Sequence, residues 1–129
     1  MDGPAEGRGG RRKRRRLSRS GDFDRVYRDG RSHANRYLVV YSFPRAGDDE
    51  PRLGISVGRK VGGAVVRNQV KRMLRDAFWA CGDILPAAHD FVIVARPEMA
   101  GVASERGAAG VEHELRDVLA SAGIAGSAT

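Results

Sequence analysis

The chain has little of several features on which protein function often depends. It has a single cysteine, Cys81, among 129 residues, so no disulfide can form within it and sites built from paired cysteines are excluded. No apolar run reaches the length of about 18 residues that a membrane span requires. The first residues are charged and rich in glycine, where a secretory signal would carry an apolar segment. These absences favour a protein of the reducing cytoplasm with no membrane contact.

Catalytic and metal-binding residues are equally sparse. The three histidines, His33, His89 and His113, fall in different predicted elements, and none has a partner at the spacing of a zinc site. Ser56 has no recognisable histidine and acid partners, although spacing alone does not settle a spatial triad. The acids at 48–50 could bind a hard cation, but acids in a turn are more often solvated. We therefore expect no catalytic group, metal or cofactor in this chain.

Positive charge is the feature the chain has in excess. It carries 23 Lys and Arg against 16 Asp and Glu, a net charge of +7. The excess gathers in residues 1–16 and in residues 59–75, and the second segment holds six cations and no carboxylate. Clustered cations are typical of proteins that bind polyphosphates, most commonly RNA or DNA. A merely soluble basic surface is the less favoured interpretation.

The length fits one domain. Residues 1–16 contain four glycines and a run of six Lys and Arg, which predicts a disordered basic arm. Such an arm can settle along phosphates, while a solubility tail or a start site placed too early are equally open interpretations. Residues 17–122 are predicted to form the single RNA-binding domain, and residues 123–129 a flexible C-terminus.

Periodicity and turn signals predict the element order α-β-β-α-β-α. The predicted helices cover about 21–29, 64–81 and 110–122, and the predicted strands about 37–43, 52–58 and 90–96. The acidic turn at 48–50 predicts that the first two strands form a hairpin. The helix between the second and third strands would make those two parallel neighbours, normally with a right-handed crossover. The fold class is therefore α+β, a two-layer sandwich with a mixed central sheet.

The helix predicted at 64–81 separates its charges from its apolar side chains at helical spacing. Its apolar stripe consists of Val66, Val70, Met73, Leu74, Ala77 and Phe78. Its other side carries Arg67, Asn68, Lys71, Arg72 and Arg75. Because stacked like charges repel one another, this side is expected to meet an anion. The glycines at 62–63 and the helix N-terminus favour close approach to phosphate.

Three stretches together resemble the protein subunit of bacterial ribonuclease P. They are Phe-Asp-Arg-Val-Tyr at 23–27, Ala-Asn-Arg at 34–36 and the continuous segment 54–78. The Gly-x-Ser-x-Gly fragment in the last segment is weak alone and could be mistaken for a hydrolase motif. Its combination with Ala-Val-x-Arg-Asn-x-x-Lys-Arg is specific. The resemblance runs in order over about residues 17–119.

The resemblance implies a fold like that of the second domain of ribosomal protein S5, with a left-handed βαβ crossover. It implies the accessory subunit of an endoribonuclease in which the RNA carries out phosphodiester hydrolysis and requires Mg²⁺. The protein would join the catalytic RNA, with one protein per RNA, and help to remove the 5′ leader from precursor tRNA. The alternative is a ribosomal or RNA-assembly protein that takes no part in cleavage.

The resemblance also assigns two RNA-binding surfaces. The catalytic RNA is expected to dock on Arg67, Asn68, Gln69, Lys71, Arg72 and Arg75. Gln69 stands where the family carries an arginine. The leader is expected to contact Phe23, Tyr27, Tyr37, Ser56, Arg59 and Lys60.

Aromatic side chains at the leader surface would stack on unpaired bases. Tyr37, Tyr41 and Phe43 alternate along the first predicted strand and should point to one side of the sheet. Core packing is the competing interpretation for Phe23, Tyr27 and Phe43.

Overall fold

The computed structural model describes residues 15–17, 20–45, 50–82 and 85–124. Its elements in chain order are β2 (Arg15–Arg16), α1 (Ser20–Asp29), β3 (Arg31–Ala34), β4 (Leu38–Pro44), β5 (Arg52–Val57), the 3₁₀ turn η2 (Arg59–Val61), α2 (Ala64–Ala80), β6 (His89–Ala95) and α3 (Met99–Ser121). The predicted α-β-β-α-β-α order is confirmed, and two short strands, β2 and β3, are added to it. Most of the predicted basic arm, residues 1–14, and the end of the predicted C-terminal tail lie outside the described residues.

The strands form one mixed sheet in the order β2-β5-β6-β4-β3. β6 pairs antiparallel with β4 and parallel with β5. The predicted hairpin between β4 and β5 is therefore wrong, because β6 lies between them. Five of the seven residues of β6 are buried, with apolar side chains on both faces, so the centre of the sheet is the only position that removes them from water. The acidic turn that suggested the hairpin lies partly at residues 46–49, outside the described part.

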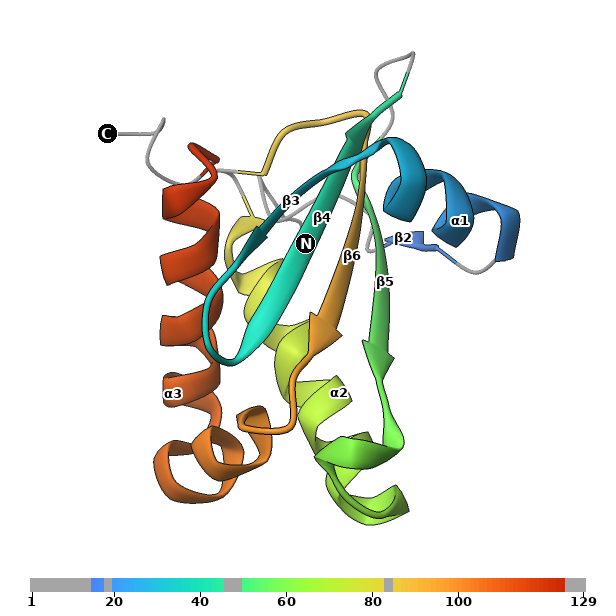
Figure 1. Ribbon diagram of the computed structural model, residues 1–129. Coiled ribbons are helices and arrows are strands. Elements are labelled where there is room, and N and C mark those ends of the chain that lie inside the picture. Colours follow the sequence, from blue (N-terminus) through green and yellow to red (C-terminus); the bar gives the residue numbers. More distant parts are fainter. Residues whose placement is uncertain (1–14, 18–19, 46–49, 83–84, 125–129) are drawn as a thin grey trace, which may run out of the picture.

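The β5-α2-β6 unit has the unusual hand. In Figure 1 the chain runs down β5, returns upward through α2 behind the sheet and runs down β6 on the left of β5. This is a left-handed crossover, whereas nearly all such units are right-handed. The left-handed crossover that the family resemblance implied is therefore confirmed.

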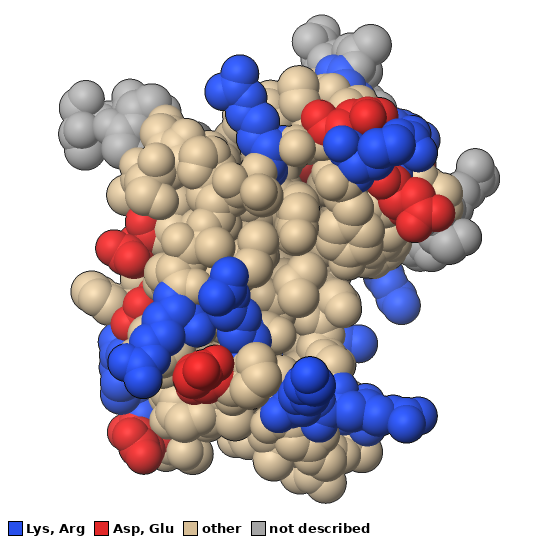
Figure 2. Space-filling view, viewed as in Figure 1, with Lys and Arg blue, Asp and Glu red and all other residues tan. Residues whose placement is uncertain are grey.

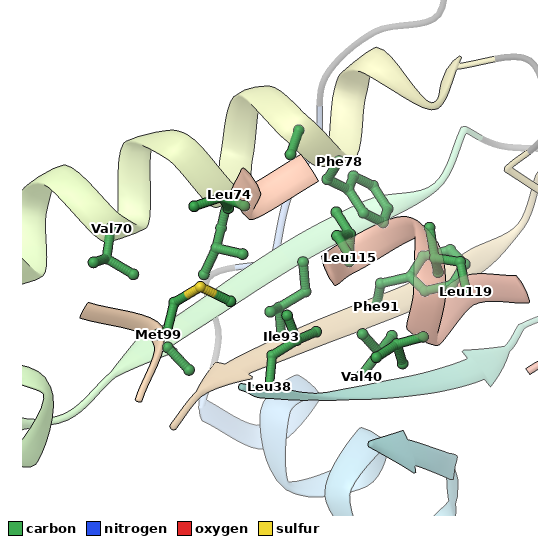
Figure 3. Close-up of a cluster of buried hydrophobic side chains, with 14 of the residues drawn as sticks. Leu38, Val40, Val70, Leu74, Phe78, Phe91, Ile93, Met99, Leu115 and Leu119 are labelled. Carbon is green, nitrogen blue, oxygen red and sulfur yellow. The ribbon is translucent and has the colours of Figure 1, made fainter. Parts of the chain in front are cut away.

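The main core lies between the sheet and the pair α2 and α3, which cover one face (Figure 1). Figure 3 shows side chains from both helices pointing onto the sheet. The residues labelled there are Leu38, Val40, Val70, Leu74, Phe78, Phe91, Ile93, Met99, Leu115 and Leu119, all 2% exposed or less. Burying one such large apolar side chain stabilises the fold by about 1.5–3 kcal/mol. This cluster therefore fixes α2 against the sheet as a rigid element.

A smaller cluster lies beneath α1 on the opposite face. Leu17, Val26 and Val92 are buried there, and α1 contacts β4 and β6. The ring of Phe23 lies directly on Gly54, where any Cβ would collide with it. A glycine at this position of β5 therefore lets α1 approach the sheet closely.

Two helices depart from the sequence prediction. On α2, Val70, Leu74, Ala77 and Phe78 are buried as expected, but Val66 is 37% exposed. Val66 belongs to the first turn, where it packs on Gly62 and not on the core. The last helix, α3, begins at Met99 and not near residue 110. Its first half carries Gly101 and is separated from the second half at Gly107, whose φ is 64°. Glycines weaken a helical pattern, so this half was missed.

The two added strands have no sequence signal of their own. β3 reads Arg-Ser-His-Ala and exists through its pairing with β4. β2 consists of Arg15 and Arg16, which pair with Arg52 and Leu53 of β5. Both residues of β2 precede residue 17, where the sequence analysis places the start of the domain. Among the described residues, no helix combines the length and apolar character needed to cross a membrane.

Candidate nucleic-acid interface

The polar face of α2 carries the cations that the sequence analysis selected. Asn68, Gln69, Arg72 and Arg75 are exposed, while Arg67 and Lys71 are half-buried. Within the described ranges, none of these cations forms an ion pair. The Nε atom of Arg67 is buried and has no hydrogen-bond partner there. The face therefore holds positive charge that no carboxylate of the described chain neutralises.

The segment leading into α2 adds to this surface. Arg59 and Lys60 are exposed in η2, directly after β5. Gly63 is the N-cap of α2 and offers no side chain to the first backbone N–H groups of the helix. Uncapped N–H groups and the positive end of the helix dipole favour a phosphate at this place.

An aromatic surface lies between α1 and the sheet. The ring centroids of Phe23 and Tyr27 are 6.3 Å apart, and those of Tyr27 and Tyr41 are 5.0 Å apart in an edge-to-face arrangement. Tyr27 is 39% exposed. Figure 2 shows a broad uncharged surface in the middle of this face, with Lys and Arg side chains projecting at its lower end. Core packing therefore describes Phe23, which packs on Gly54, while Tyr27 reaches solvent and is free to stack on a base.

Ser56 belongs to the same surface. Its side chain lies near the phenol of Tyr27, and it lies on β5 facing α1. Partial burial raises the pKa of Tyr27, the nearby Tyr41 raises it further, and the neighbouring hydroxyl of Ser56 opposes the shift. Tyr27 therefore stays a neutral hydroxyl near pH 7. Phe23, Tyr27 and Ser56 are brought together as the sequence analysis expected.

Tyr37 does not join them, and the expectation that it shares a face with Tyr41 is wrong. Its side chain packs against the core on the α2 and α3 side of the sheet. The cause is a turn before β4, in which the backbone N–H groups of Tyr37 and Leu38 donate to the side-chain oxygen of Asn35 at 2.8 and 3.1 Å. Because residue 37 lies in this turn, it does not follow the alternation of β4. Tyr41 and Phe43 do lie on the α1 side, as predicted.

A buried ion network at one end of the sheet was not anticipated. Asp90 is fully buried and accepts hydrogen bonds from Arg45 at 2.9 Å and from Arg52 at 2.7 and 2.8 Å. Arg52 also lies 3.7 Å from Asp22 of α1, which pairs with Arg25 at 2.9 Å. Nothing in the local pattern marks Asp90 as buried, because its partners are distant in sequence. The network ties α1 to two strands and so fixes the position of the aromatic surface.

The remaining candidates for chemistry are not brought together. His33, His89 and His113 lie on β3, β6 and α3. In the part of the chain that the structure describes, no group of three or more potential ligands is placed to hold a metal ion. Cys81 is buried, and this burial raises the pKa of its thiol. It donates to the carbonyl oxygen of Ala77 and is a small apolar core residue.

Comparison with known proteins identifies the family to which this arrangement is similar. The family model described as ribonuclease P matches residues 12–122. The ribonuclease P protein component of Bacillus pumilus is 36% identical over 105 residues, which cover 81% of this chain and 88% of that protein. The corresponding protein of Halalkalibacterium halodurans is 41% identical over 95 residues, covering 74% of this chain and 80% of that protein.

Solved structures agree with the sequence comparison. The RNase P protein of Staphylococcus aureus superposes with a TM-score of 0.77 at 35% identity, covering 87% of this chain and 98% of that one. The RNase P protein of Thermotoga maritima gives a TM-score of 0.71 at 32% identity, with coverage of 84% and 96%. The likeness thus extends over the α+β domain, including α2 and the α1 surface.

Proposed function

Since the chain belongs to the ribonuclease P protein family, we propose that its two surfaces hold the two RNAs of the reaction. It is the protein subunit of this endoribonuclease, which acts in the maturation of tRNA 5′ ends, and membership of the family implies partnership with the ribonuclease P RNA. In the proposal, α2 docks on that RNA and the surface between α1 and the sheet receives the 5′ leader of precursor tRNA.

The unpaired cations of α2 are the observation that carries the first half of the proposal. Arg67, Lys71, Arg72 and Arg75 have no carboxylate partner among the described residues, so an external polyanion can take that place. Binding to phosphates releases counterions, and arginine forks can grip phosphate oxygens with two hydrogen bonds.

The two amides of α2 extend this surface beyond its charges. Asn68 and Gln69 are exposed, and their side chains can reach base edges or a 2′-OH. Gln69, in place of the family's arginine, keeps hydrogen-bonding groups and gives up one charge. The proposed docking surface is therefore somewhat less cationic than the family pattern.

The aromatic surface supports the second half. Each exposed ring can stack on an unpaired base with about 1–3 kcal/mol and little sequence preference, which suits a protein that handles many leaders. We assign this role to Phe23, Tyr27 and Tyr41, and we replace the earlier candidate Tyr37 because it lies on the opposite side of the sheet. Ser56 and the exposed Arg59 and Lys60 would contact the leader backbone.

In this proposal the RNA subunit carries the chemistry and binds the Mg²⁺ ions. The contribution of the protein is electrostatic. Two RNA backbones brought within about one Debye length, roughly 10 Å at moderate salt, repel each other, and the cations of α2 and η2 reduce that repulsion. Substrate and Mg²⁺ would then bind the ribonucleoprotein more readily than the RNA alone.

The direct test is cleavage of a precursor tRNA by its cognate ribonuclease P RNA at low Mg²⁺, with and without this protein. We expect strong stimulation by the protein, and no cleavage when the RNA subunit is omitted. The triple variant Arg67→Ala, Lys71→Ala, Arg72→Ala should lose the stimulation. The matched variant Arg116→Ala, which removes an arginine of α3 already paired with Glu112, should keep it. Absence of stimulation by the unaltered protein would overturn the proposal.

The proposal of one protein per RNA has a test of its own. Titration of the RNA with protein in a mobility-shift or mass measurement should end at equimolar protein. A plateau at two proteins per RNA would contradict this part alone.

A further inference from the structure

A cavity of about 350 Å³ lies at the outer edge of β5, away from the centre of the aromatic surface. It is walled by β2, α1, β5 and α2, which are distant in sequence. Its volume is at the lower end of the range for small-molecule sites, about 300–1,000 Å³. The residues that line it are Arg15, Arg16, Leu17, Phe23, Leu53, Gly54, Ile55, Lys71, Arg75 and Trp79. We call it the edge pocket.

The lining of the edge pocket combines charge of one sign with aromatic walls. Four of its ten residues are Lys or Arg and none is acidic. Lys71 and Arg75 form no ion pair within the described ranges. Phe23 and Trp79 supply the aromatic surface, and Trp79 is the only tryptophan of the chain. An anionic ligand with a flat aromatic part would satisfy both kinds of wall.

The fold keeps this pocket open by two features of β5. Its neighbour on this side, β2, pairs only with Arg52 and Leu53, so within the described chain the edge of β5 from Gly54 onward has no partner strand. Gly54 also has no side chain, and the ring of Phe23 occupies that space and faces the cavity. A residue with a Cβ at this position would push Phe23 away and reshape the wall.

We propose that the edge pocket binds one unpaired nucleotide of RNA. The phosphate would lie on Lys71 and Arg75 of α2 and Arg16 of β2, and the base would stack on Trp79 or Phe23. The inference rests on the proposed function. It deepens that function because Phe23 also belongs to the aromatic surface, while Lys71 and Arg75 also belong to the cationic face of α2. The pocket is therefore the place where the two RNA surfaces meet around the edge of the sheet.

The single tryptophan provides the experiment. The isolated protein is titrated with adenosine 5′-monophosphate, inorganic phosphate and adenosine while Trp79 fluorescence is recorded. We expect the nucleotide to change the emission and to bind about 5- to 150-fold more tightly than phosphate, since one stacked base adds about 1–3 kcal/mol. Adenosine without its phosphate should bind more weakly than the nucleotide. Equal affinities for phosphate and nucleotide would reduce the pocket to an anion site and overturn the proposal.

A matched pair of variants separates a local contact from general charge. Arg75→Gln removes one exposed cation of the pocket and should weaken nucleotide binding at least several-fold. Arg116→Gln removes the same charge from α3, which contributes no residue to the pocket lining, and should leave nucleotide binding unchanged. Equal weakening by the two variants would contradict a nucleotide site at β5.

Competition then identifies the source of the nucleotide. A single-stranded oligoribonucleotide with a leader sequence, or the ribonuclease P RNA, is added to the protein saturated with the mononucleotide. Displacement by the first assigns the pocket to the leader, and displacement by the second assigns it to the RNA subunit. Displacement by neither would overturn the inference. The low-Mg²⁺ cleavage test is independent of this outcome, so failure of the pocket and failure of the proposed function can be told apart.

Discussion

Arginines gather in two regions, at the end of the sheet where β6 begins and on the outer face of α2. The arginines of the two regions have different partners. At the sheet end, Arg45 and Arg52 donate to the fully buried Asp90. On α2, Arg67 and Arg72 meet no carboxylate among the described residues. The same side chain therefore serves the fold in one region and is left for a partner in the other.

This difference shows why net charge alone does not locate an RNA-binding surface. The paired arginines contribute to the excess of +7 as much as the unpaired ones, yet their charge is already neutralised inside the fold. A buried pair is also costly to break, because the remaining charge is left without a partner in a medium of low dielectric constant. The two regions should therefore respond to mutation in different quantities, stability in one and RNA binding in the other.

The largest expected effect is on stability. Asp90→Ala leaves Arg45 and Arg52 without their buried partner and should lower the free energy of unfolding by about 3–5 kcal/mol. Urea denaturation followed by circular dichroism measures this. The control Asp24→Ala removes an exposed carboxylate of α1 and should change stability by less than about 0.5 kcal/mol. Similar losses in both variants would mean that Asp90 does not hold the sheet end together.

Next in size is the effect of α2 on RNA binding. The triple variant Arg67→Ala, Lys71→Ala, Arg72→Ala should bind the ribonuclease P RNA more weakly and with a flatter salt dependence. Each lost phosphate contact should reduce the slope of log K against log salt by about 0.7–0.9. Filter binding at several salt concentrations provides the slope. An unchanged slope would remove α2 from the docking surface.

A smaller effect is expected at the aromatic surface. Tyr27→Ala should weaken binding of precursor tRNA by the holoenzyme by about 1–3 kcal/mol, through loss of one stacking contact, and should leave mature tRNA almost unaffected. Tyr37→Ala serves as the comparison, since Tyr37 packs on the other side of the sheet. A leader-specific loss in the Tyr37 variant would contradict the placement of the leader.

The smallest effect concerns pH. Burial raises the pKa of Tyr27 above its ordinary value near 10. Because the folded state holds this proton more tightly than the unfolded state, the contribution of Tyr27 to stability is complete below about pH 10 and is lost as the pH rises through the folded pKa. Ultraviolet titration of the protein minus that of Tyr27→Phe should show a phenol ionising later than free tyrosine. Ionisation at the ordinary value would contradict partial burial.

Much of the fold could be predicted where local pattern and tertiary packing agree. The apolar stripe of α2 from Val70 onward is buried as its period predicts, and the apolar runs of β4 and β6 form strands of the sheet as expected. Prediction failed where distant residues decide the structure. β6 enters between β4 and β5 although a turn signal favoured a hairpin, and β2 exists only because β5 offers it an edge.

The candidate site divides in the same way. The cationic residues of α2 were identifiable because a helix places them on one face whatever surrounds it. The aromatic residues were harder. Tyr37 was misplaced because the side chain of Asn35 holds it in a turn, and the place of Trp79 in the edge pocket was not recognised because the other walls come from β2, α1 and β5. Residues whose neighbours come from distant segments gave no signal in the sequence.

The most direct test compares two single variants, Arg72→Ala on α2 and Arg45→Ala at the sheet end, in both measurements. Arg72→Ala should lower the salt slope for ribonuclease P RNA by about 0.7–0.9. Its free energy of unfolding should stay within about 0.5 kcal/mol of the unaltered protein. Arg45→Ala should lower stability by more than that and keep the slope. If both variants change the same quantity to the same extent, the paired arginines of the sheet end and the unpaired arginines of α2 do not differ in role.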